Sequence, residues 1–208
     1  MSGVAAGELE TATAAAPLPR AWYDRSAIAV APDLLGKRLV HVTAAGAIGG
    51  RIVETEAYTG PEDLAAHSAR GRTPRTTTMF GEPGHLYVYL IYGLHHCLNV
   101  VCGPGDKPEA VLIRAVAIDE GEELVRARRG ASPPRHRLAT GPGNVGAAFG
   151  IDRSFDGGDL LDGPVRVLDG PGPDGVDRRA RIGVDYAGEW ATRPFRFLIR
   201  NDPHISRR

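Results

Sequence analysis

The sequence predicts a single α+β domain, in which short helices flank a mainly antiparallel β-sheet and one β-hairpin protrudes. Three observations support this fold class. The expected strands outnumber the expected helices, short turns rich in Gly and Pro separate them, and 208 residues suit one domain with a sizeable core. We divide the chain into an Ala-rich leader over residues 1–19, which we expect to be disordered, and a folded domain over residues 20–208.

The composition argues against several classes of protein. The formal net charge is zero, so no overall field indicates a nucleic-acid partner, although a local charged patch can still form. Two cysteines do not make a disulfide framework. No apolar run approaches the roughly 20 residues that span a bilayer, and the leader lacks the features of a signal peptide. We therefore expect a cytoplasmic protein, nucleoid-associated in a bacterium, with no membrane partner.

The N-terminal half alternates short elements. Ser26–Leu35 predicts a helix that packs against the core, and Arg38–Val42 and Gly50–Tyr58 predict strands around a glycine-rich turn. Gly60–Ser68 predicts a short helix, because a proline occupies its first turn and two acidic residues follow. Ala69–Gly81 predicts a loop that carries three arginines and no acidic residue.

The middle of the chain predicts a hairpin, a strand and a helix. Leu86–Tyr92 and Cys97–Cys102 are β-rich runs joined at residues 93–96, and Ala110–Ala117 is an apolar strand. Asp119–Arg129 predicts a helix, because acids begin it, arginines end it and a glycine follows. Further along we expect a helix over Gly141–Phe149, strands over Pro164–Leu168, Arg181–Val184 and Phe195–Ile199, and a loop over Asp169–Arg179.

Two acidic residues and a phenol share one face of the strand that ends at Tyr58. Side chains alternate along a strand, so Glu54, Glu56 and Tyr58 point to the same side. Buried charge is costly unless it is paired, so this face is expected to line a polar site in which a carboxylate acts as a general base. The alternative from these residues alone is an exposed strand edge that carries charge.

The predicted hairpin carries three tyrosines. Tyr87 and Tyr89 share one face of its first strand, where a half-buried position in the sheet is the simpler interpretation. Tyr92 stands beside Gly93 at the tip. A large ring at an exposed tip can act as a wedge, as in proteins that bend or open DNA.

Other motifs are weaker. We expect no metal site, because the available ligands lack the spacing of a zinc centre. These ligands are His67, His95, His96, Cys97 and Cys102. Residues 141–146 match the Gly-x-Gly-x-x-Gly pattern without a preceding strand, so a plain turn, or a turn that presents a helix N-terminus to a phosphate, fits better. The arginines over residues 126–137 form either a nucleic-acid contact or a solvated face.

Several segments together resemble one family in order and spacing, over roughly residues 20 to 200. The segments are Arg51–Tyr58, Gly60–Ser68, Met79-Phe80, Leu86–Gly93, Asn99, Gly141-Pro142, Ala187–Ala191 and Arg193–Phe197. They resemble the alkyladenine DNA glycosylases, the 3-methyladenine glycosylases of the mammalian type. The resemblance implies a metal-independent monomer with a curved sheet and no cofactor. Such an enzyme excises alkylated or deaminated purines from duplex DNA in base excision repair.

The resemblance also implies catalytic roles, with residues 20–208 as the glycosylase domain. Glu56 would be the general base that activates water for attack on the sugar C1′, and Arg114 would lie near the sugar and its phosphate. Tyr92 would intercalate into the gap that the flipped nucleotide leaves. Both lysines, Lys37 and Lys107, lie outside the matched motifs. Lyase chemistry through a Schiff base is therefore not expected, and water is the nucleophile.

The same resemblance implies how the base is held. Tyr58, His67 and Tyr89 would line the pocket, where stacking on an aromatic ring favours a base by about 1–3 kcal/mol. Asn99 would lie at the pocket floor and disfavour the amino group of guanine. A cationic alkylated purine would gain from the electron-rich rings. The sequence does not rank 3-methyladenine, 7-methylguanine, hypoxanthine and ethenoadenine as substrates.

Contacts to the DNA backbone are implied for Arg75, Gly143 and Asn144. The family often has lysine where Asn144 stands, so this phosphate contact is expected to be weaker here. His95 and His96 replace residues that are often bulky and apolar. Two other functions stay open: a non-catalytic module that binds lesions in DNA, and a hydrolase of free nucleosides that needs no wedge.

Overall fold

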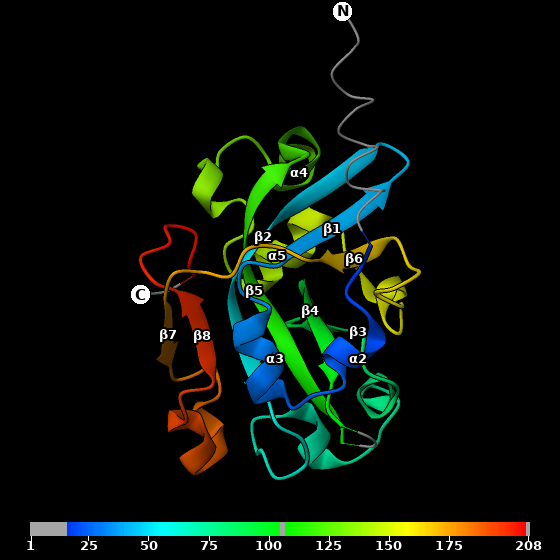
Figure 1. Cartoon of the computed structure of the whole chain (residues 1–208), viewed down its shortest axis with the longest axis vertical. Coiled ribbons are helices and arrows are strands. Elements are labelled where there is room, and N and C mark those ends of the chain that lie inside the picture. Colours follow the sequence, from blue (N-terminus) through cyan, green and yellow to red (C-terminus); the bar gives the residue numbers. More distant parts are fainter. Residues whose placement is uncertain (1–15, 105–106, 207–208) are drawn as a thin grey trace, which may run out of the picture.

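Eight antiparallel strands form the sheet at the centre of the protein (Figure 1). The structure is a computed structural model that describes residues 16–104 and 107–206. The strands in these residues are β1 (Arg38–Thr43), β2 (Gly46–Tyr58), β3 (Leu86–Ile91), β4 (His95–Cys102), β5 (Glu109–Glu120), β6 (Val165–Leu168), β7 (Val176–Arg179) and β8 (Arg196–Ile199). Their order is β3-β4-β5-β2-β1-β6, with β8 paired to β2 and β7 to β8. The predicted α+β class is confirmed.

Short helices connect and cover these strands. The α-helices are α2 (Arg20–Tyr23), α3 (Ala27–Asp33), α4 (Glu122–Arg129) and α5 (Pro142–Phe149). The 3₁₀ helices are η1 (His67–Arg70), η2 (Thr77–Phe80), η3 (Arg135–Arg137), η4 (Arg153–Phe155) and η5 (Asp185–Thr192). Among the described residues, none of the helices has the length and apolar character needed to cross a membrane.

The long strand β2 organises the sheet. One of its edges pairs with β5, and the other pairs first with β1 and then with β8. The pairing with β5 shifts register on both sides of Glu54, so β2 is irregular there. Glu54 and Glu56 consequently stand in the middle of the sheet, between β5 and β8. The alternative of an exposed strand edge is wrong.

The main core lies between the sheet and the helices α3 and α5. Leu34 and Phe149, which are far apart in the sequence, are both fully buried in it. The fit of α5 on β4 is close, because a methyl group added at Gly146 would lie 2.2 Å from the backbone oxygen of His96. Glycine at this position therefore lets the helix approach the strand that leads into the pocket.

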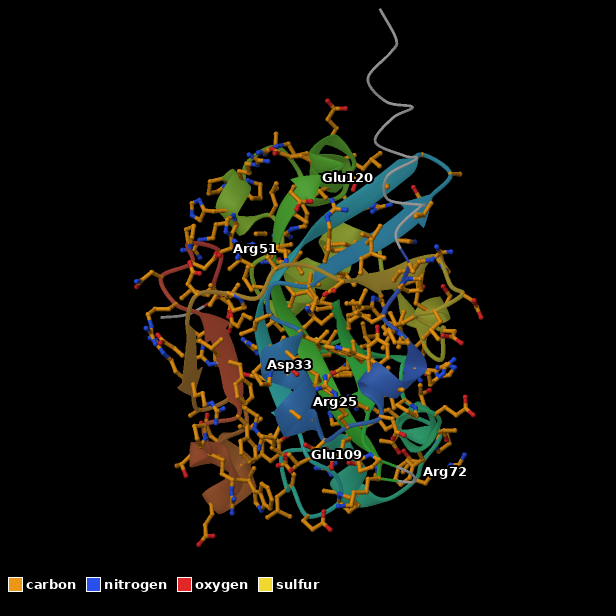
Figure 2. All side chains as sticks on the ribbon, in the orientation of Figure 1. Arg25, Asp33, Arg51, Arg72, Glu109 and Glu120 are labelled. Atoms are coloured by element: carbon orange, nitrogen blue, oxygen red, sulfur yellow. The ribbon has the colours of Figure 1, made fainter. Side chains whose placement is uncertain are left out.

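Charged side chains project from the outside of the molecule (Figure 2). Arg25 and Asp33, at the two ends of the α3 segment, form an ion pair of 2.8 Å that remains partly open to solvent. Such exposed pairs contribute little to stability. They contrast with the fully buried pairs beside the pocket.

Two predicted helices differ from the structure. Of the segment Gly60–Ser68, residues 60–66 are a series of turns and only His67 and Ser68 are helical, as the start of η1. The Asp63 carboxylate accepts from the backbone N–H groups of Thr59 and Ala65. This local bonding competes with helix formation. The helix predicted from Asp119 begins at Glu122 instead. Residues 119 and 120 extend β5, where their carboxylates bind the Arg38 guanidinium.

Two predictions near the C-terminal end are also wrong. The segment predicted as a loop over Asp169–Arg179 contains β7, which pairs with β8. Arg181–Val184, predicted as a strand, is not one. Its backbone has another use, since the N–H group of Ile182 donates to a carboxylate oxygen of Glu56 at 2.8 Å.

Two residues of the predicted leader, Pro17 and Leu18, contact the folded domain. Residues 1–15 lie outside the described residues, so their part of the prediction stays open. Leu18 is buried, its N–H group donates to the backbone oxygen of Val167 at 2.9 Å, and Pro17 bridges to Leu168. These contacts join residues 17 and 18 to the folded domain.

Candidate active site

A pocket of about 600 Å³ opens between the β3–β4 hairpin, the start of α5 and the loop before η5. Eight of the predicted site residues line it: Tyr58, His67, Tyr89, Tyr92, Asn99, Arg114, Gly143 and Asn144. The sheet supplies Tyr58, Tyr89, Asn99 and Arg114, η1 supplies His67, the hairpin turn supplies Tyr92, and α5 supplies Gly143 and Asn144. Residues distant in sequence thus meet at one cavity, as the resemblance implies.

Glu56 lies next to this lining and is itself fully buried. One carboxylate oxygen, Oε2, accepts from the Tyr58 hydroxyl at 2.9 Å and lies 3.3 Å from Nη1 of Arg114. The other oxygen, Oε1, accepts from the backbone N–H group of Ile182 at 2.8 Å. Burial raises the pKa of Glu56 above its usual value, and Arg114 and the two hydrogen bonds offset only part of this rise. A raised pKa suits a general base.

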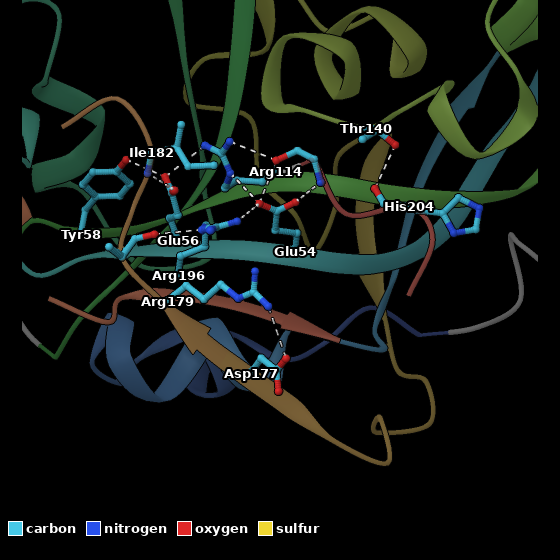
Figure 3. A network of polar contacts seen from close by, with 12 residues as sticks. Glu54, Glu56, Tyr58, Arg114, Thr140, Asp177, Arg179, Ile182, Arg196 and His204 are labelled. Carbon is cyan, nitrogen blue, oxygen red and sulfur yellow. Dashed lines mark hydrogen bonds and ion pairs between the residues drawn. The ribbon is translucent and has the colours of Figure 1, made fainter. Parts of the chain in front are cut away.

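Arg114 lies between two carboxylates (Figure 3). Its Nε donates to Oε1 of Glu54 at 3.0 Å, while its Nη1 faces Glu56. Arg196 also donates to Oε1 of Glu54, at 3.2 Å. Two buried acids and two buried arginines therefore form one compact network, which satisfies the requirement that buried charges be paired.

Aromatic rings form one wall of the pocket. His67 stands at 75° to the ring of Tyr89, with 4.6 Å between the ring centroids, and its Nδ1 lies 2.9 Å from the Tyr87 hydroxyl. Burial, together with Arg75 and Arg70, lowers the pKa of His67 to about 4. His67 is therefore neutral near pH 7, so it can either donate or accept a hydrogen bond in the pocket.

Asn99 is buried in β4 with a fixed amide. Its Nδ2 donates to the backbone oxygen of Tyr87 at 2.9 Å and lies 3.4 Å from that of Cys97. These two carbonyls settle which end of the amide is nitrogen. Tyr87 was missed as a site residue. Its place on the face of Tyr89 was the sequence signal that could have identified it.

Tyr92 occupies the tip of the hairpin. The residue is 84% exposed, and its backbone has φ of +54°, a region that bulky residues rarely adopt. Leu94, two residues further on, is 76% exposed. The turn thus presents a ring and an aliphatic side chain to solvent at the mouth of the pocket, the shape expected of a wedge.

The predicted backbone-contact residues surround the same mouth. Gly143 and Asn144 lie in the first turn of α5 and line the pocket. Arg75 is exposed and its guanidinium lies 5.3 Å from the centroid of the Tyr89 ring. His95 also lines the pocket, and it packs so closely that a methyl group on Gly143 would lie 2.8 Å from it.

A buried ion pair, Asp63–Arg181, lies next to Tyr58 of the pocket. Arg181 donates to both carboxylate oxygens of Asp63, at 2.5 and 2.8 Å, and neither side chain is exposed. The Arg181 guanidinium also lies 4.8 Å from the centroid of the Tyr58 ring. Sequence analysis missed this pair, because 118 residues separate its members and no local pattern marks them.

The described residues contain no group of three or more His, Cys, Asp or Glu side chains arranged to hold a metal ion. Cys97 lines the pocket, and burial raises the pKa of its thiol, which is therefore protonated near neutral pH. The ionisable centre of the site is consequently the network of Glu54, Glu56 and Arg114.

Comparison with known proteins identifies the family of the chain. Residues 21–203 match the methylpurine-DNA glycosylase (MPG) family. The chain belongs to this family. Membership confirms the predicted resemblance and the predicted enzyme class, a hydrolase of the DNA glycosylase type.

Several relatives of this glycosylase share the name "Putative 3-methyladenine DNA glycosylase". The one from Methanocella arvoryzae is 49% identical over 192 residues, which cover 92% of this chain and 96% of the relative. The one from Streptomyces avermitilis is 46% identical over 195 residues and covers 91% of each chain. The one from Myxococcus xanthus is 46% identical over 192 residues, with 91% of this chain and 93% of the relative covered.

Proposed function

We propose that this glycosylase hydrolyses the N-glycosidic bond of alkylated or deaminated purines that have been flipped out of duplex DNA. The single observation that supports this reaction most strongly is the buried carboxylate of Glu56 beside an aromatic pocket, with a raised pKa. The candidate substrates are 3-methyladenine, 7-methylguanine, hypoxanthine and ethenoadenine. The enzyme acts as a cytoplasmic monomer and requires no metal or cofactor.

In the proposed reaction Glu56 is ionised and accepts a proton from water. The water oxygen forms the new bond to C1′, and the C1′–N bond breaks with its electron pair leaving on the base. The positive charge that develops on the sugar lies near the Glu56 carboxylate, which stabilises it. Arg114 holds the carboxylate in its ionised form and lies near the sugar and phosphate.

The pocket supplies recognition. Tyr58, His67 and Tyr89 enclose the flipped base, and their rings favour a cationic alkylated purine through cation–π contact. The positive charge also makes such a base a good leaving group, whereas hypoxanthine needs protonation. Asn99, at the floor, disfavours the amino group of guanine.

Flipping requires something to fill the gap in the duplex. Extrusion of a nucleotide costs a few kcal/mol, and the exposed ring of Tyr92 offsets part of this cost by stacking between bases. The N-terminus of α5, with Gly143 and Asn144, and the exposed Arg75 contact the phosphates beside the flipped nucleotide.

The test is base release from duplexes that each carry one of the four lesions, with alkali to cleave abasic sites. We expect release by the wild type, loss of release in Glu56→Gln, and wild-type release in Glu189→Gln, which makes the same change at an exposed position. Binding of lesion DNA without release by the wild type would identify a non-catalytic binding module instead.

A second variant separates duplex repair from hydrolysis of free nucleosides. Tyr92→Ala removes the wedge but leaves Glu56 and Arg114 in place. We expect slower release from duplex DNA and an unchanged rate on a single strand that carries the same lesion. Equal rates of the variant and the wild type on duplex DNA would contradict the wedge.

A further inference from the structure

The segment Asp202–Ser206 lies outside the motifs that carry the resemblance, and it contacts the network of Glu54 and Arg114. Ser206 binds Glu54 twice: its N–H group donates to Oε2 at 2.6 Å, and its hydroxyl donates to Oε1 at 2.9 Å. Arg114 in turn donates from Nη2 to the same hydroxyl at 3.2 Å. The Ser206 hydroxyl therefore links the carboxylate of Glu54 to the guanidinium of Arg114.

This link determines how Arg114 is held. Its guanidinium has Nε on Glu54, Nη1 toward Glu56 and Nη2 on Ser206. All three nitrogens thus have an acceptor or an opposite charge nearby, and the planar group cannot rotate without losing one of them. Glu54 and Ser206 orient Arg114, while Nη1 remains directed to Glu56.

The segment is anchored at two further places. Asp202 is buried and accepts from Arg51 at 2.8 Å. The Thr140 hydroxyl lies 2.9 Å from the backbone oxygen of His204 (Figure 3) and 2.6 Å from that of His136, and it can donate to either. Thr140 itself accepts from Asn144, whose Nδ2 donates to its backbone oxygen at 2.7 Å. Hydrogen bonds thus connect the rim of the pocket at α5 to the guanidinium of Arg114.

We propose that Ser206 is a positioning residue for the reaction. In this proposal the segment Asp202–Ser206 belongs to the active site, and Ser206 orients Arg114 relative to Glu56. This inference rests on the proposed glycosylase function. Ser206 does not touch the base in this proposal, because it does not line the pocket. It acts through Arg114 and Glu54.

The test is single-turnover base release by Ser206→Ala, with enzyme in excess over a duplex that carries the lesion released fastest by the wild type. We expect the maximal rate to fall about tenfold or more, because the variant loses both hydrogen bonds of the hydroxyl, to Glu54 and from Arg114, and each involves a charged group. The enzyme concentration at half-maximal rate should be unchanged, because the pocket and the wedge are intact. The melting temperature should fall by only a few degrees, so the variant stays folded during the assay.

Two variants control this experiment. Ser206→Thr keeps the hydroxyl and should restore most of the rate. Ser154→Ala should have the wild-type rate. It also removes a serine hydroxyl that donates to a carboxylate, because Ser154 binds Asp152 at 2.6 Å, but this pair lies on the surface.

Thr140→Val should lower the rate less than Ser206→Ala. The double variant should be no slower than Ser206→Ala alone, because both substitutions act through the segment Asp202–Ser206.

Three outcomes would contradict the inference. Ser206→Ala could release base at the wild-type rate, or Ser206→Thr could be as slow as Ser206→Ala, or the loss could appear only as a lower melting temperature. Each of these leaves the glycosylase function in place, because the wild type still releases base. Absence of release by the wild type, in contrast, would contradict the proposed function and this inference together.

Discussion

The pair Asp63–Arg181 allows a quantitative prediction about stability. Asp63→Asn keeps the size and shape of the side chain but removes its charge. Arg181 donates two hydrogen bonds to this carboxylate, and both side chains are 0% exposed. The variant therefore leaves the Arg181 guanidinium buried without its counter-charge.

The magnitude follows from the burial of the pair. Removing one partner of a buried ion pair costs about 3–5 kcal/mol, because the remaining charge loses its compensation. The rings of Tyr58 and Phe195, at 4.8 and 5.4 Å from the guanidinium, offset a small part of this cost. For a chain of this size the loss corresponds to a melting temperature lower by roughly 6–20 °C.

The assay is urea unfolding followed by circular dichroism, with the free energy of unfolding compared between variants. Asp33→Asn is the matched control, since Asp33 pairs with Arg25 at 2.8 Å but is 53% exposed. We expect a loss below about 1 kcal/mol there. The double variant Asp63→Asn with Arg181→Met should recover part of the stability. A loss from Asp63→Asn no larger than that of the control would refute the reasoning.

Two further predictions concern the site, and a third concerns the packing of α5 on β4. Glu56 acts as a base only when ionised, so activity rises with pH through its pKa, and the raised pKa places this acidic limb above the usual 4.5. Tyr58→Phe removes a hydrogen bond to the carboxylate, which moves the limb to still higher pH; a profile of base release against pH that coincides with the wild type would contradict this. Asn99→Ser should allow release of undamaged guanine, measured as free base by chromatography, and unchanged guanine release would exclude the assigned role. Gly146→Ala should destabilise the fold by roughly 1–3 kcal/mol in urea, because its methyl group would lie 2.2 Å from a backbone oxygen of β4. Gly172→Ala, in open space, is the control and should be close to neutral.

Local patterns predicted the elements that depend on local interactions. The hairpin of β3 and β4 follows from two β-rich runs and a turn, and α3 and α5 lie within the ranges predicted for them. Predictions were wrong where a distant partner decides the local conformation. Asp63 binds Arg181 in addition to the nearby N–H groups that replace the predicted helix, and Asp119 binds Arg38 from a strand.

The candidate site shows the same division. The face of β2 that carries Glu54, Glu56 and Tyr58 could be predicted, because alternation along a strand is a property of the backbone. The partners of Glu54 could not be predicted. Ser206 lies 152 residues away in sequence, and nothing in its neighbourhood marks it as a ligand of an acidic residue.

The sequence by itself determined which chemical groups are available and on which faces of their strands and turns they lie. It placed a carboxylate pair on one strand and an exposed tyrosine at a hairpin tip. Only the tertiary structure decided that Glu56 is buried, and therefore that its pKa is raised. The physical reason is that desolvation and charge pairing depend on distances in space, which the packing of β2, β5 and β8 determines, whereas side-chain alternation depends only on the local backbone.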